Sequence, residues 1–324
     1  MIPLRNLMKI LIVRFSSIGD IVLTTPVVRC LKTQLDNVEI HYASKVQYQS
    51  ILQSNPYIDK LIFLKENLTD LIQSLKEEKY DVVIDLHNNL RTRILKWRLG
   101  TTSFSFNKLN LEKWLMVNFK INQLPQMHIV DRYLETTKSL GIKNDALGLD
   151  YFIPEEDEVP WTWLPETHQY GFVAYAIGGQ HETKKLPVER MIELCKKIDK
   201  QMVVLGGKED FDNGECIVKT LQESIFNTCG KLNLNQSASL LKKASYVFSH
   251  DTGLMHIAAA LRKEVFSIWG NTIPAFGMYP YRTKFHALEN TQINCRPCSK
   301  IGFDKCPKGH FKCMNEMKFD FQLK

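Results

Sequence analysis

Residues 9–26 read KILIVRFSSIGDIVLTTP. An apolar, β-branched run over residues 10–15 leads into a short polar turn, and an apolar segment typical of a helix follows it. A strand, a turn and a helix in that order begin a βαβ unit, which builds parallel sheets. We therefore expect this stretch to open an α/β fold, with its turn at the carboxyl end of the first strand, where such sheets bind ligands.

The same alternation continues along all 324 residues. The acidic stretch 154–168 contains three prolines and separates two series of strands, so we expect a linker there. The sequence predicts two Rossmann-like, doubly wound domains facing across a cleft, with bounds 1–158 and 159–324. Strand-like runs lie at residues 10–15, 38–42, 60–64, 82–86, 172–177, 202–205, 246–248 and 265–269.

The overall composition is that of a globular protein, with 44% apolar residues and a net charge of +7. No apolar run approaches the length of a transmembrane helix, and the first residues lack a signal-peptide pattern, so we expect a cytoplasmic protein with reduced cysteines. Residues 86–120 hold seven Lys or Arg but only one acid, Glu112. Such a stretch suits nucleic acid, anionic lipid or a phosphorylated ligand, or it is simply a solvated helix face.

The turn FSSIGD lacks the glycine pattern of a dinucleotide fingerprint and that of a P-loop. Gly19 is expected to permit a tight turn, and Ser17 is a good helix cap. Asp20 sits just inside a helix start, where the helix dipole favours an ionised carboxylate. It is therefore either a general base or a residue that only stabilises the helix.

Three later turns also follow strands and carry polar residues. In AIGGQHETKKLP, residues 176–187, glycines permit close approach of a ligand and Lys184 can meet a phosphate. In HDTGLMH, residues 250–256, the helix start offers free N–H groups to an anion, and His256 lies one turn further along. In LGGKED, residues 205–210, Glu209 or Asp210 can accept from ribose hydroxyls. Each set is also explained by helix capping or by a solvated loop.

The carboxyl-terminal region contains four cysteines with the spacing C-x2-C-x7-C-x6-C and a nearby His310. Four thiols in a short segment can hold zinc, although the spacing is not that of a common zinc module. Structural zinc and free reduced thiols therefore both remain open for Cys295, Cys298, Cys306 and Cys313.

Several of these motifs together resemble the ADP-heptose:lipopolysaccharide heptosyltransferases, glycosyltransferase family 9. The similar segments are FSSIGD at 15–20, K-x-L-P at 184–187 and DTGLMHIAAAL at 251–261, and the cysteine-rich tail is similar to that of some members. The resemblance implies a GT-B fold, with the acceptor on the first domain and the nucleotide-sugar on the second. It also implies inversion at the anomeric carbon with no required metal or other cofactor.

Residue roles follow from the same resemblance. Asp20 matches the family's proposed base, and Lys184 matches the lysine that contacts the nucleotide phosphates. Leu186 departs from the tryptophan found in many members. The remaining donor-binding candidates are Thr183, Glu209, Asp251, Thr252, Gly253, Leu254 and His256. The acceptor-binding candidates, chosen by location, are Ser17, Gly19, His87, Asn88, Arg91 and His128.

The implied reaction moves heptose from ADP-heptose to the inner core of lipopolysaccharide, either lipid A–Kdo or a heptosylated acceptor. Asp20 deprotonates the acceptor hydroxyl, while Lys184 and the helix start at 251–253 stabilise the departing ADP. Alternatives are transfer from another NDP-sugar, a Rossmann-type oxidoreductase, or a zinc-containing nucleic-acid binder. Because the acceptor is a membrane lipid, we expect peripheral binding at the cytoplasmic face of the inner membrane, through residues 108–120 with Lys108, Lys113 and Lys120, and no nucleic-acid partner.

Overall fold

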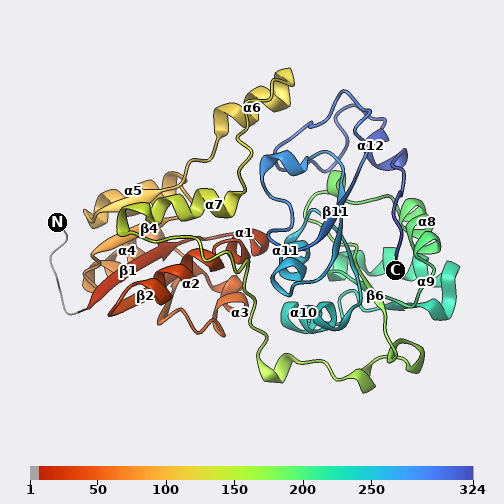
Figure 1. Ribbon diagram of the computed structural model, residues 1–324, viewed down its shortest axis with the longest axis horizontal. Coiled ribbons are helices and arrows are strands. Elements are labelled where there is room, and N and C mark those ends of the chain that lie inside the picture. The colour runs from red at the N-terminus through yellow and green to blue at the C-terminus, as the bar shows by residue number, and fades with distance from the viewer. Residues whose placement is uncertain (1–6, 324) are drawn as a thin grey trace. The chain divides into compact units, whose positions relative to one another are not determined.

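The computed structural model describes residues 7–323 and divides them into two compact units (Figure 1). The first unit comprises the described residues up to Lys108 together with Met127–Phe152. The second comprises Leu109–Gln126 and the chain from Ile153 onward.

This division differs from the expected boundary in two places. The main part of the second unit begins at Ile153 rather than at residue 159. Residues 109–126 also group with the second unit. The physical reason is a set of contacts made by Lys120. Its ammonium donates to the carbonyl oxygens of Cys295 at 3.1 Å and Pro297 at 2.7 Å. The chain therefore leaves the first unit after Lys108 and returns to it at Met127.

The first unit is built on a five-stranded, wholly parallel sheet in the order β3-β2-β1-β4-β5. The chain adds strands on one side of β1 and then on the other, so the strand order reverses between β1 and β4. Ligands of such sheets bind beyond the carboxyl ends of the strands at this switch point. The strands are β1 (Met8–Val13), β2 (Val38–Lys45), β3 (Lys60–Leu64), β4 (Val82–Asp85) and β5 (Ser103–Ser105).

Helices cover both faces of this sheet, since alternate strand residues point to opposite sides. Leu11 and Val13 share a buried cluster with apolar residues of α4 and α5. On the other face α2 packs against β2 and against α7. The helices of the unit are α1 (Ile18–Val22), α2 (Thr25–Gln34), α3 (Gln49–Leu52), α4 (Leu68–Glu77), α5 (Leu90–Leu99) and α7 (Ile129–Leu134).

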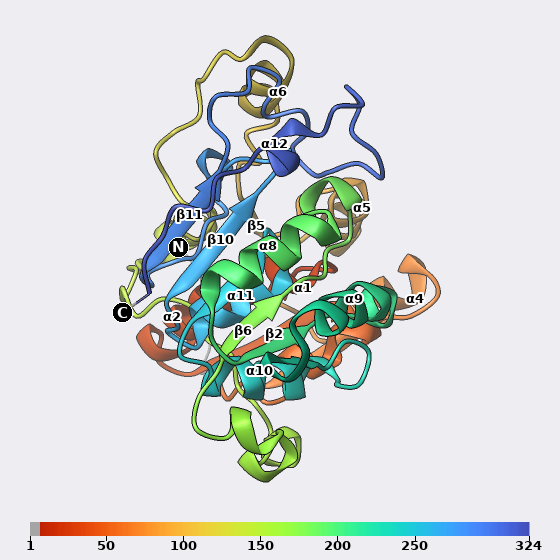
Figure 2. The ribbon, with the colours of Figure 1, turned by 90° about the vertical axis from the view of Figure 1, so that its right-hand side faces the viewer.

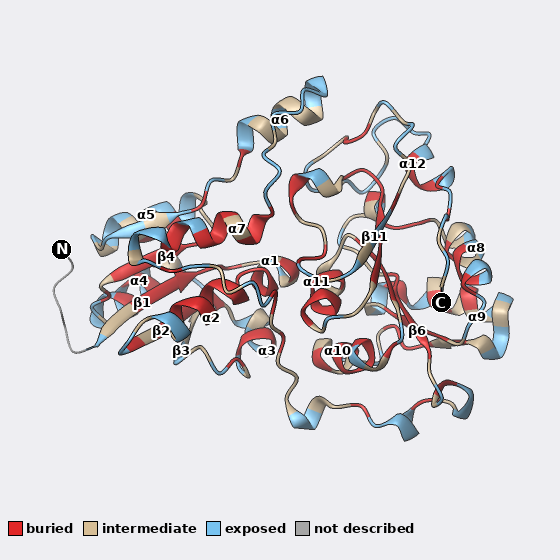
Figure 3. Ribbon diagram, in the orientation of Figure 1, coloured by how far each residue is buried: buried red, intermediate tan, exposed pale blue. Residues whose placement is uncertain are grey.

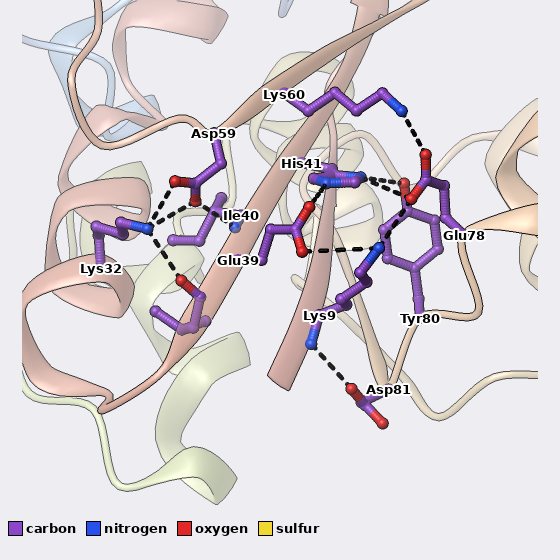
Figure 4. A network of polar contacts seen from close by, with 11 residues as sticks. Lys9, Lys32, Glu39, Ile40, His41, Asp59, Lys60, Glu78, Tyr80 and Asp81 are labelled. Carbon is purple, nitrogen blue, oxygen red and sulfur yellow. Dashed lines mark hydrogen bonds and ion pairs between the residues drawn. The ribbon is translucent and has the colours of Figure 1, made fainter. Parts of the chain in front are cut away.

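A polar network closes the amino end of this sheet, opposite the switch-point edge (Figure 4). Buried His41 lies 2.6 Å from a Glu39 oxygen and 2.8 Å from the Tyr80 hydroxyl. Glu78 accepts from Lys9 at 3.0 Å and also pairs with Lys60. Hydrogen bonds from these two lysines lower the pKa of Glu78 to about 2. The charged residues at this edge therefore stabilise one another.

The second unit repeats the architecture with six parallel strands in the order β11-β10-β9-β6-β7-β8. Here the strand order reverses between β6 and β9. The strands are β6 (Val173–Ala176), β7 (Met202–Leu205), β8 (Ile225–Asn227), β9 (Val247–His250), β10 (Val265–Trp269) and β11 (Phe285–Glu289).

Helices again occupy both faces of the second sheet. α8 packs against α9, and α10 packs against α11; Figure 2 looks onto α8 and α9 lying over the strands. Figure 3 shows that burial is concentrated in the strands and in the helix sides that face them. The helices are α6 (Asn110–Phe119), α8 (Val188–Ile198), α9 (Phe211–Leu221), α10 (Leu234–Lys243), α11 (Gly253–Ala260) and α12 (Lys312–Asn315).

The two parallel sheets confirm the expected doubly wound α/β fold class. The expected linker, residues 154–168, forms three single turns of 3-10 helix. In residues 7–323, no helix combines the length and apolar character that crossing a bilayer requires.

Candidate active site

The carboxylate of Asp20 lies at the switch point of the first sheet, in α1 directly after β1. The Arg14 guanidinium lies 2.7 Å from Asp20 Oδ2. Ser17 donates to the same oxygen from its hydroxyl at 2.9 Å and from its backbone N–H at 3.2 Å. Among residues 7–323, every ion pair and hydrogen bond of Asp20 reaches Oδ2. The second oxygen, Oδ1, therefore has no hydrogen-bond or ion-pair partner among these residues.

Arg14 is itself held in place by the surrounding backbone. Its guanidinium donates to the carbonyl oxygens of Ser16 at 2.6 Å and Leu86 at 2.5 Å, and to the Tyr133 hydroxyl at 3.0 Å. Burial alone would raise the pKa of Asp20. The Arg14 charge and the Ser17 hydrogen bonds outweigh burial and lower the pKa below its usual value. Asp20 is thus a fixed, ionised carboxylate whose side chain is 21% exposed.

His87 and Asn88 follow β4, the neighbouring strand across the switch point. Their backbone N–H groups donate to Asp85 Oδ1 at 3.0 and 2.7 Å, which fixes this turn. Burial, and then the nearby charges of Arg14 and Lys108, lowers the pKa of His87 to about 4, so its ring is neutral at pH 7. The structure thus brings His87 into the electrostatic neighbourhood of Arg14 and Asp20. Arg91 lies one residue inside α5 and is exposed.

Three other acceptor candidates have local structural roles. Ser17 caps α1 and bonds Asp20. Gly19 is buried inside α1 and is absent from the positive-φ residues, so the expectation of a special backbone angle is wrong. His128 is 2% exposed and caps α7 by accepting from the Val130 N–H at 3.1 Å. Because its ring is committed to that helix, we do not retain His128 as an acceptor ligand.

The switch point of the second sheet joins the turn after β6 to the turn after β9. Lys184 extends from the first turn to Asp251 in the second, with 2.7 Å between Nζ and Oδ2. The same carboxylate oxygen accepts from the Thr272 hydroxyl at 2.9 Å. A Cβ on Gly179 would lie 3.1 Å from the Lys185 side chain and 3.5 Å from that of Thr252. The backbone of the first turn therefore approaches the start of α11 closely.

His250, the last residue of β9, also connects these two turns and was not among the predicted site residues. Its Nδ1 lies 3.0 Å from the Ile177 carbonyl oxygen, and its Nε2 accepts from the Leu186 N–H at 3.1 Å. Burial lowers the pKa of this histidine to about 4. A neutral ring with its proton on Nδ1 satisfies both partners and holds the K-x-L-P segment against β9.

The start of α11 presents the D-T-G motif. Thr252 occupies the N-cap position in an extended conformation, and α11 begins at Gly253. The first N–H groups of a helix lack intrahelical partners and favour an anion. Leu254 is half-buried, whereas His256 is buried within the helix, 2% exposed. The backbone at 252–254, rather than the imidazole, is thus the part of this motif that a ligand can reach.

Thr183 and Glu209 occupy different environments. Thr183 is buried and exchanges hydrogen bonds with the backbone of Phe303, so it anchors the 299–303 loop. Glu209 is exposed at the end of β7, where a Cβ on Gly207 would collide with its carboxylate. The neighbouring Asp210 is buried, accepts from the Gly207 N–H at 3.0 Å and pairs with Lys185 at 3.5 Å. Of the two candidates, only Glu209 is free to meet a ligand.

The cysteine-rich tail is the segment for which structural zinc and reduced thiols were both left open. Within residues 7–323, no three His, Cys, Asp or Glu side chains are grouped so as to hold a metal ion. Cys295 Sγ lies 3.9 Å from His310 Nε2, whereas the Cys298 thiol donates to the Cys295 carbonyl oxygen. Burial raises the pKa of Cys313 to about 11, because its side chain packs in the core of the second unit.

Arg296 joins this tail to the residues that follow β10 and to the end of β11. It donates to the backbone carbonyls of Gly270 at 2.5 Å, Asn290 at 2.8 Å and Thr272 at 3.0 Å, and it pairs with Glu289 at 2.9 Å. The tail thereby fastens the loop after β10, which carries the Thr272 partner of Asp251. Its role in the described structure is to support the second switch point.

Two doubly wound parallel sheets, each with polar groups at its switch point, are the architecture of the GT-B fold class. The family model described as glycosyltransferase family 9 (heptosyltransferase) matches residues 68–306. The chain therefore belongs to glycosyltransferase family 9 and is a transferase.

Relatives of known name are similar over most of their length. The chain is 25% identical over 292 residues to lipopolysaccharide heptosyltransferase 1 of Campylobacter coli, which covers 82% of this chain and 84% of that protein. It is 24% identical over 298 residues to lipopolysaccharide heptosyltransferase 2 of Escherichia coli, covering 83% and 84%.

Solved structures show the same fold. The family 9 glycosyltransferase of Veillonella parvula superposes with a TM-score of 0.72 at 24% identity, covering 89% of each chain. The ADP-heptose heptosyltransferase II of E. coli superposes with a TM-score of 0.70 at 20% identity, covering 95% of this chain and 98% of that one.

Proposed function

We propose that this protein transfers heptose from ADP-heptose to the inner core of lipopolysaccharide, with lipid A–Kdo or a heptosylated core as acceptor. Support for the sugar comes from the relatives, which are named as lipopolysaccharide heptosyltransferases. A structure of the E. coli heptosyltransferase WaaC, with a TM-score of 0.65 to this chain, was determined with ADP-2-deoxy-2-fluoro heptose.

Asp20 is the proposed general base. The observation that carries this role is its geometry: Arg14 and Ser17 hold Oδ2, and Oδ1 remains open. An ionised carboxylate can accept the proton of an acceptor hydroxyl as that oxygen attacks the anomeric carbon. The Arg14 ion pair also makes Asp20 a weak base, so proton transfer accompanies attack, when the hydroxyl becomes acidic, rather than preceding it.

The second switch point stabilises the leaving group in this proposal. Attack from the face opposite ADP breaks the bond between the anomeric carbon and the phosphate oxygen, and negative charge grows on the diphosphate. Lys184 and the N–H groups at the start of α11 are fixed before the reaction, and fixed charges and dipoles stabilise developing charge most effectively. Asp251 keeps Lys184 oriented. No metal ion has a role in this mechanism.

The test is ADP release from ADP-heptose with a lipid A–Kdo acceptor, for wild type and Asp20→Asn. We expect acceptor-dependent turnover by the wild type and a loss of about 100-fold to 10,000-fold in kcat for the variant, with donor binding unchanged. Asp36→Asn, the same change at an exposed carboxylate of the first unit that is not among the site residues, is the matched control.

Two outcomes would contradict the proposal. Equal turnover by Asp20→Asn would remove Asp20 from the chemistry while leaving the transferase intact. No turnover by the wild type would reject the heptose assignment, and release of nucleotide from other NDP-sugars would then identify the donor.

A further inference from the structure

The outer face of α5 has apolar side chains that no other part of the described structure covers. Leu90, Ile94 and Trp97 are 73%, 37% and 80% exposed. Residues spaced by four and then three positions lie on one side of a helix, so the three form a single stripe. The opposite side of α5 already contributes Leu95 and Leu99 to the core of the first unit. The helix therefore has two apolar sides, of which one is buried in the first unit and the other is exposed.

Arginines flank this stripe. Arg91, Arg93 and Arg98 are exposed, and within residues 7–323 their side chains form no ion pair or hydrogen bond. The remaining cation of the helix, Lys96, is instead paired with buried Asp85 at 2.8 Å. Residues 86–111 contain no acidic residue at all. The face thus combines an apolar centre with an uncompensated positive rim.

We propose that α5 is the site at which the protein docks on an anionic phospholipid bilayer. Helices that lie in a membrane interface place apolar and aromatic side chains among the lipids and hold Lys or Arg at the headgroups. Tryptophan favours that interface, and each basic residue near an anionic surface adds to the attraction. We refer to Leu90, Arg93, Ile94, Trp97 and Arg98 as the docking face.

Other occupants fit this face less well. A second copy of the chain would bring two sets of unpaired arginines together, which is repulsive. A nucleic acid would satisfy the arginines but would leave Leu90 and Ile94 against a charged phosphate backbone. A bilayer matches both features, because its headgroups are anionic and its interior is apolar.

The position of α5 in the fold agrees with this docking. The helix begins directly after His87 and Asn88, at the carboxyl edge of the first sheet where Asp20 lies. Its ten residues extend about 15 Å from that edge. Here the inference rests on the proposed function, since a lipid-anchored acceptor must come to Asp20 from a membrane.

In this proposal the docking face is preferred to the surface expected from sequence, residues 108–120. Two of the three lysines there have partners in the second unit. Lys120 donates to backbone carbonyls, and the Lys113 ammonium lies 5.9 Å from the centre of the Phe276 ring. Charges already engaged in this way contribute less to a membrane surface than the unpaired arginines of α5.

The experiment is co-sedimentation of the full-length protein with vesicles of phosphatidylcholine alone, or with about one third phosphatidylglycerol. We expect binding to the anionic vesicles only. Arg93→Glu/Arg98→Glu should weaken it by about tenfold or more, and Ile94→Ser/Trp97→Ser by several-fold. The matched control is Lys65→Glu/Lys79→Glu, which makes the same charge change at exposed positions of the same unit and should bind as the wild type does.

Several results would overturn the docking face. They are equal binding by the α5 variants and the wild type, loss of binding by Lys113→Glu/Lys120→Glu alone, or an absence of anionic-vesicle binding by the wild type. Tighter binding to duplex DNA than to vesicles, or self-association that the Trp97 variant abolishes, would assign the face to another partner.

A second assay separates this inference from the proposed function. ADP release with a deacylated, water-soluble acceptor should be equal for the wild type and Arg93→Glu/Arg98→Glu, whereas release with a vesicle-embedded acceptor should fall in the variant. Failure of the soluble reaction in both proteins would reject the proposed function and leave the vesicle-binding result standing.

Discussion

At the first switch point, buried Arg14 forms an ion pair with Asp20. At the second, Lys184 forms an ion pair with Asp251 beside the N-terminus of α11. Both sites lie beyond the carboxyl ends of parallel strands where strand order reverses. In the first, the partly exposed group is an anion, Asp20, with one free oxygen. In the second, a cation and backbone N–H groups face outward. One topology therefore presents a carboxylate in one unit, and a lysine with the N–H groups of a helix start in the other.

The largest effect that would test this contrast comes from Lys184. Removing its charge in Lys184→Met should reduce kcat/KM for the nucleotide-sugar by about 100-fold to 1,000-fold, because a preorganised cation at the leaving diphosphate is lost. The measurement is ADP release over a range of donor concentrations. Lys196→Met, an exposed lysine on α8, is the control. An unchanged kcat/KM in Lys184→Met would mean that the second switch point does not receive the anion.

A smaller effect concerns the scaffold of the second site. His250→Leu leaves the Ile177 carbonyl and the Leu186 N–H without their buried partner, and should cost about 2–3 kcal/mol of unfolding free energy. The measurement is urea unfolding at pH 7. Unchanged stability would show that this histidine does not hold the two turns together.

The same variant also tests how the free energy of unfolding depends on pH. The pKa of His250 is about 4 in the folded protein, below its usual value of 6.5. The unfolded chain therefore binds the proton first, and the folded state loses stability as the pH falls from about 6.5 to about 4. His250→Leu lacks this loss, so the stability difference between the two proteins should narrow toward acid pH. A constant difference would contradict the buried neutral ring.

The first site predicts a shift in a pH profile. In the wild type the lowered pKa of Asp20 keeps it ionised at pH values where an ordinary aspartate begins to protonate, so its protonation should limit kcat/KM only in more acidic solution. Arg14→Met removes the charge that offsets burial, so the pKa of Asp20 should rise and the acid limb should move to higher pH. The check is kcat/KM from pH 4 to 8, alongside thermal unfolding. If the variant is folded and the acid limb of its kcat/KM profile lies at the wild-type pH, Arg14 does not set the pKa of Asp20.

The smallest expected effect is that of metal removal. Treatment with EDTA should leave ADP release and the melting temperature unchanged, because neither switch point requires a metal in the proposed mechanism. Elemental analysis of the purified protein is the accompanying measurement. Activity lost on chelation and restored by one divalent metal would contradict the assignment of leaving-group stabilisation to Lys184 and α11.

Sequence patterns predicted the central strands well, and the physical reason is burial. Strands β7 and β10 have the predicted bounds, since apolar runs buried on both faces stand out from their surroundings. The edge strand β3 also has its predicted bounds, although most of its residues are only partly buried. The strands β5, β8 and β11 were missed. They are short or partly exposed edge strands, and their pattern SFS, IFN or FHALE carries little apolar signal.

The location of the motif residues could be predicted from the sequence, whereas their partners could not. Asp20, Lys184 and Asp251 lie at the two switch points, because turns after parallel strands must lie at one edge of a sheet. Arg14 and His250 were not identified, although each is a polar residue at the end of an apolar strand. Which backbone groups such a side chain meets depends on strands distant in sequence, and no local pattern encodes that.

The fastening of the carboxyl-terminal tail has a practical consequence for truncated versions of the enzyme. The segment that matches the family ends at residue 306, but the core of the second unit includes Met314, Met317 and Phe319. A protein shortened to the matched segment would expose the sheet face that these side chains cover. The last stretch of chain is thus an integral layer of the second unit, and a stable minimal enzyme must extend at least through Phe319.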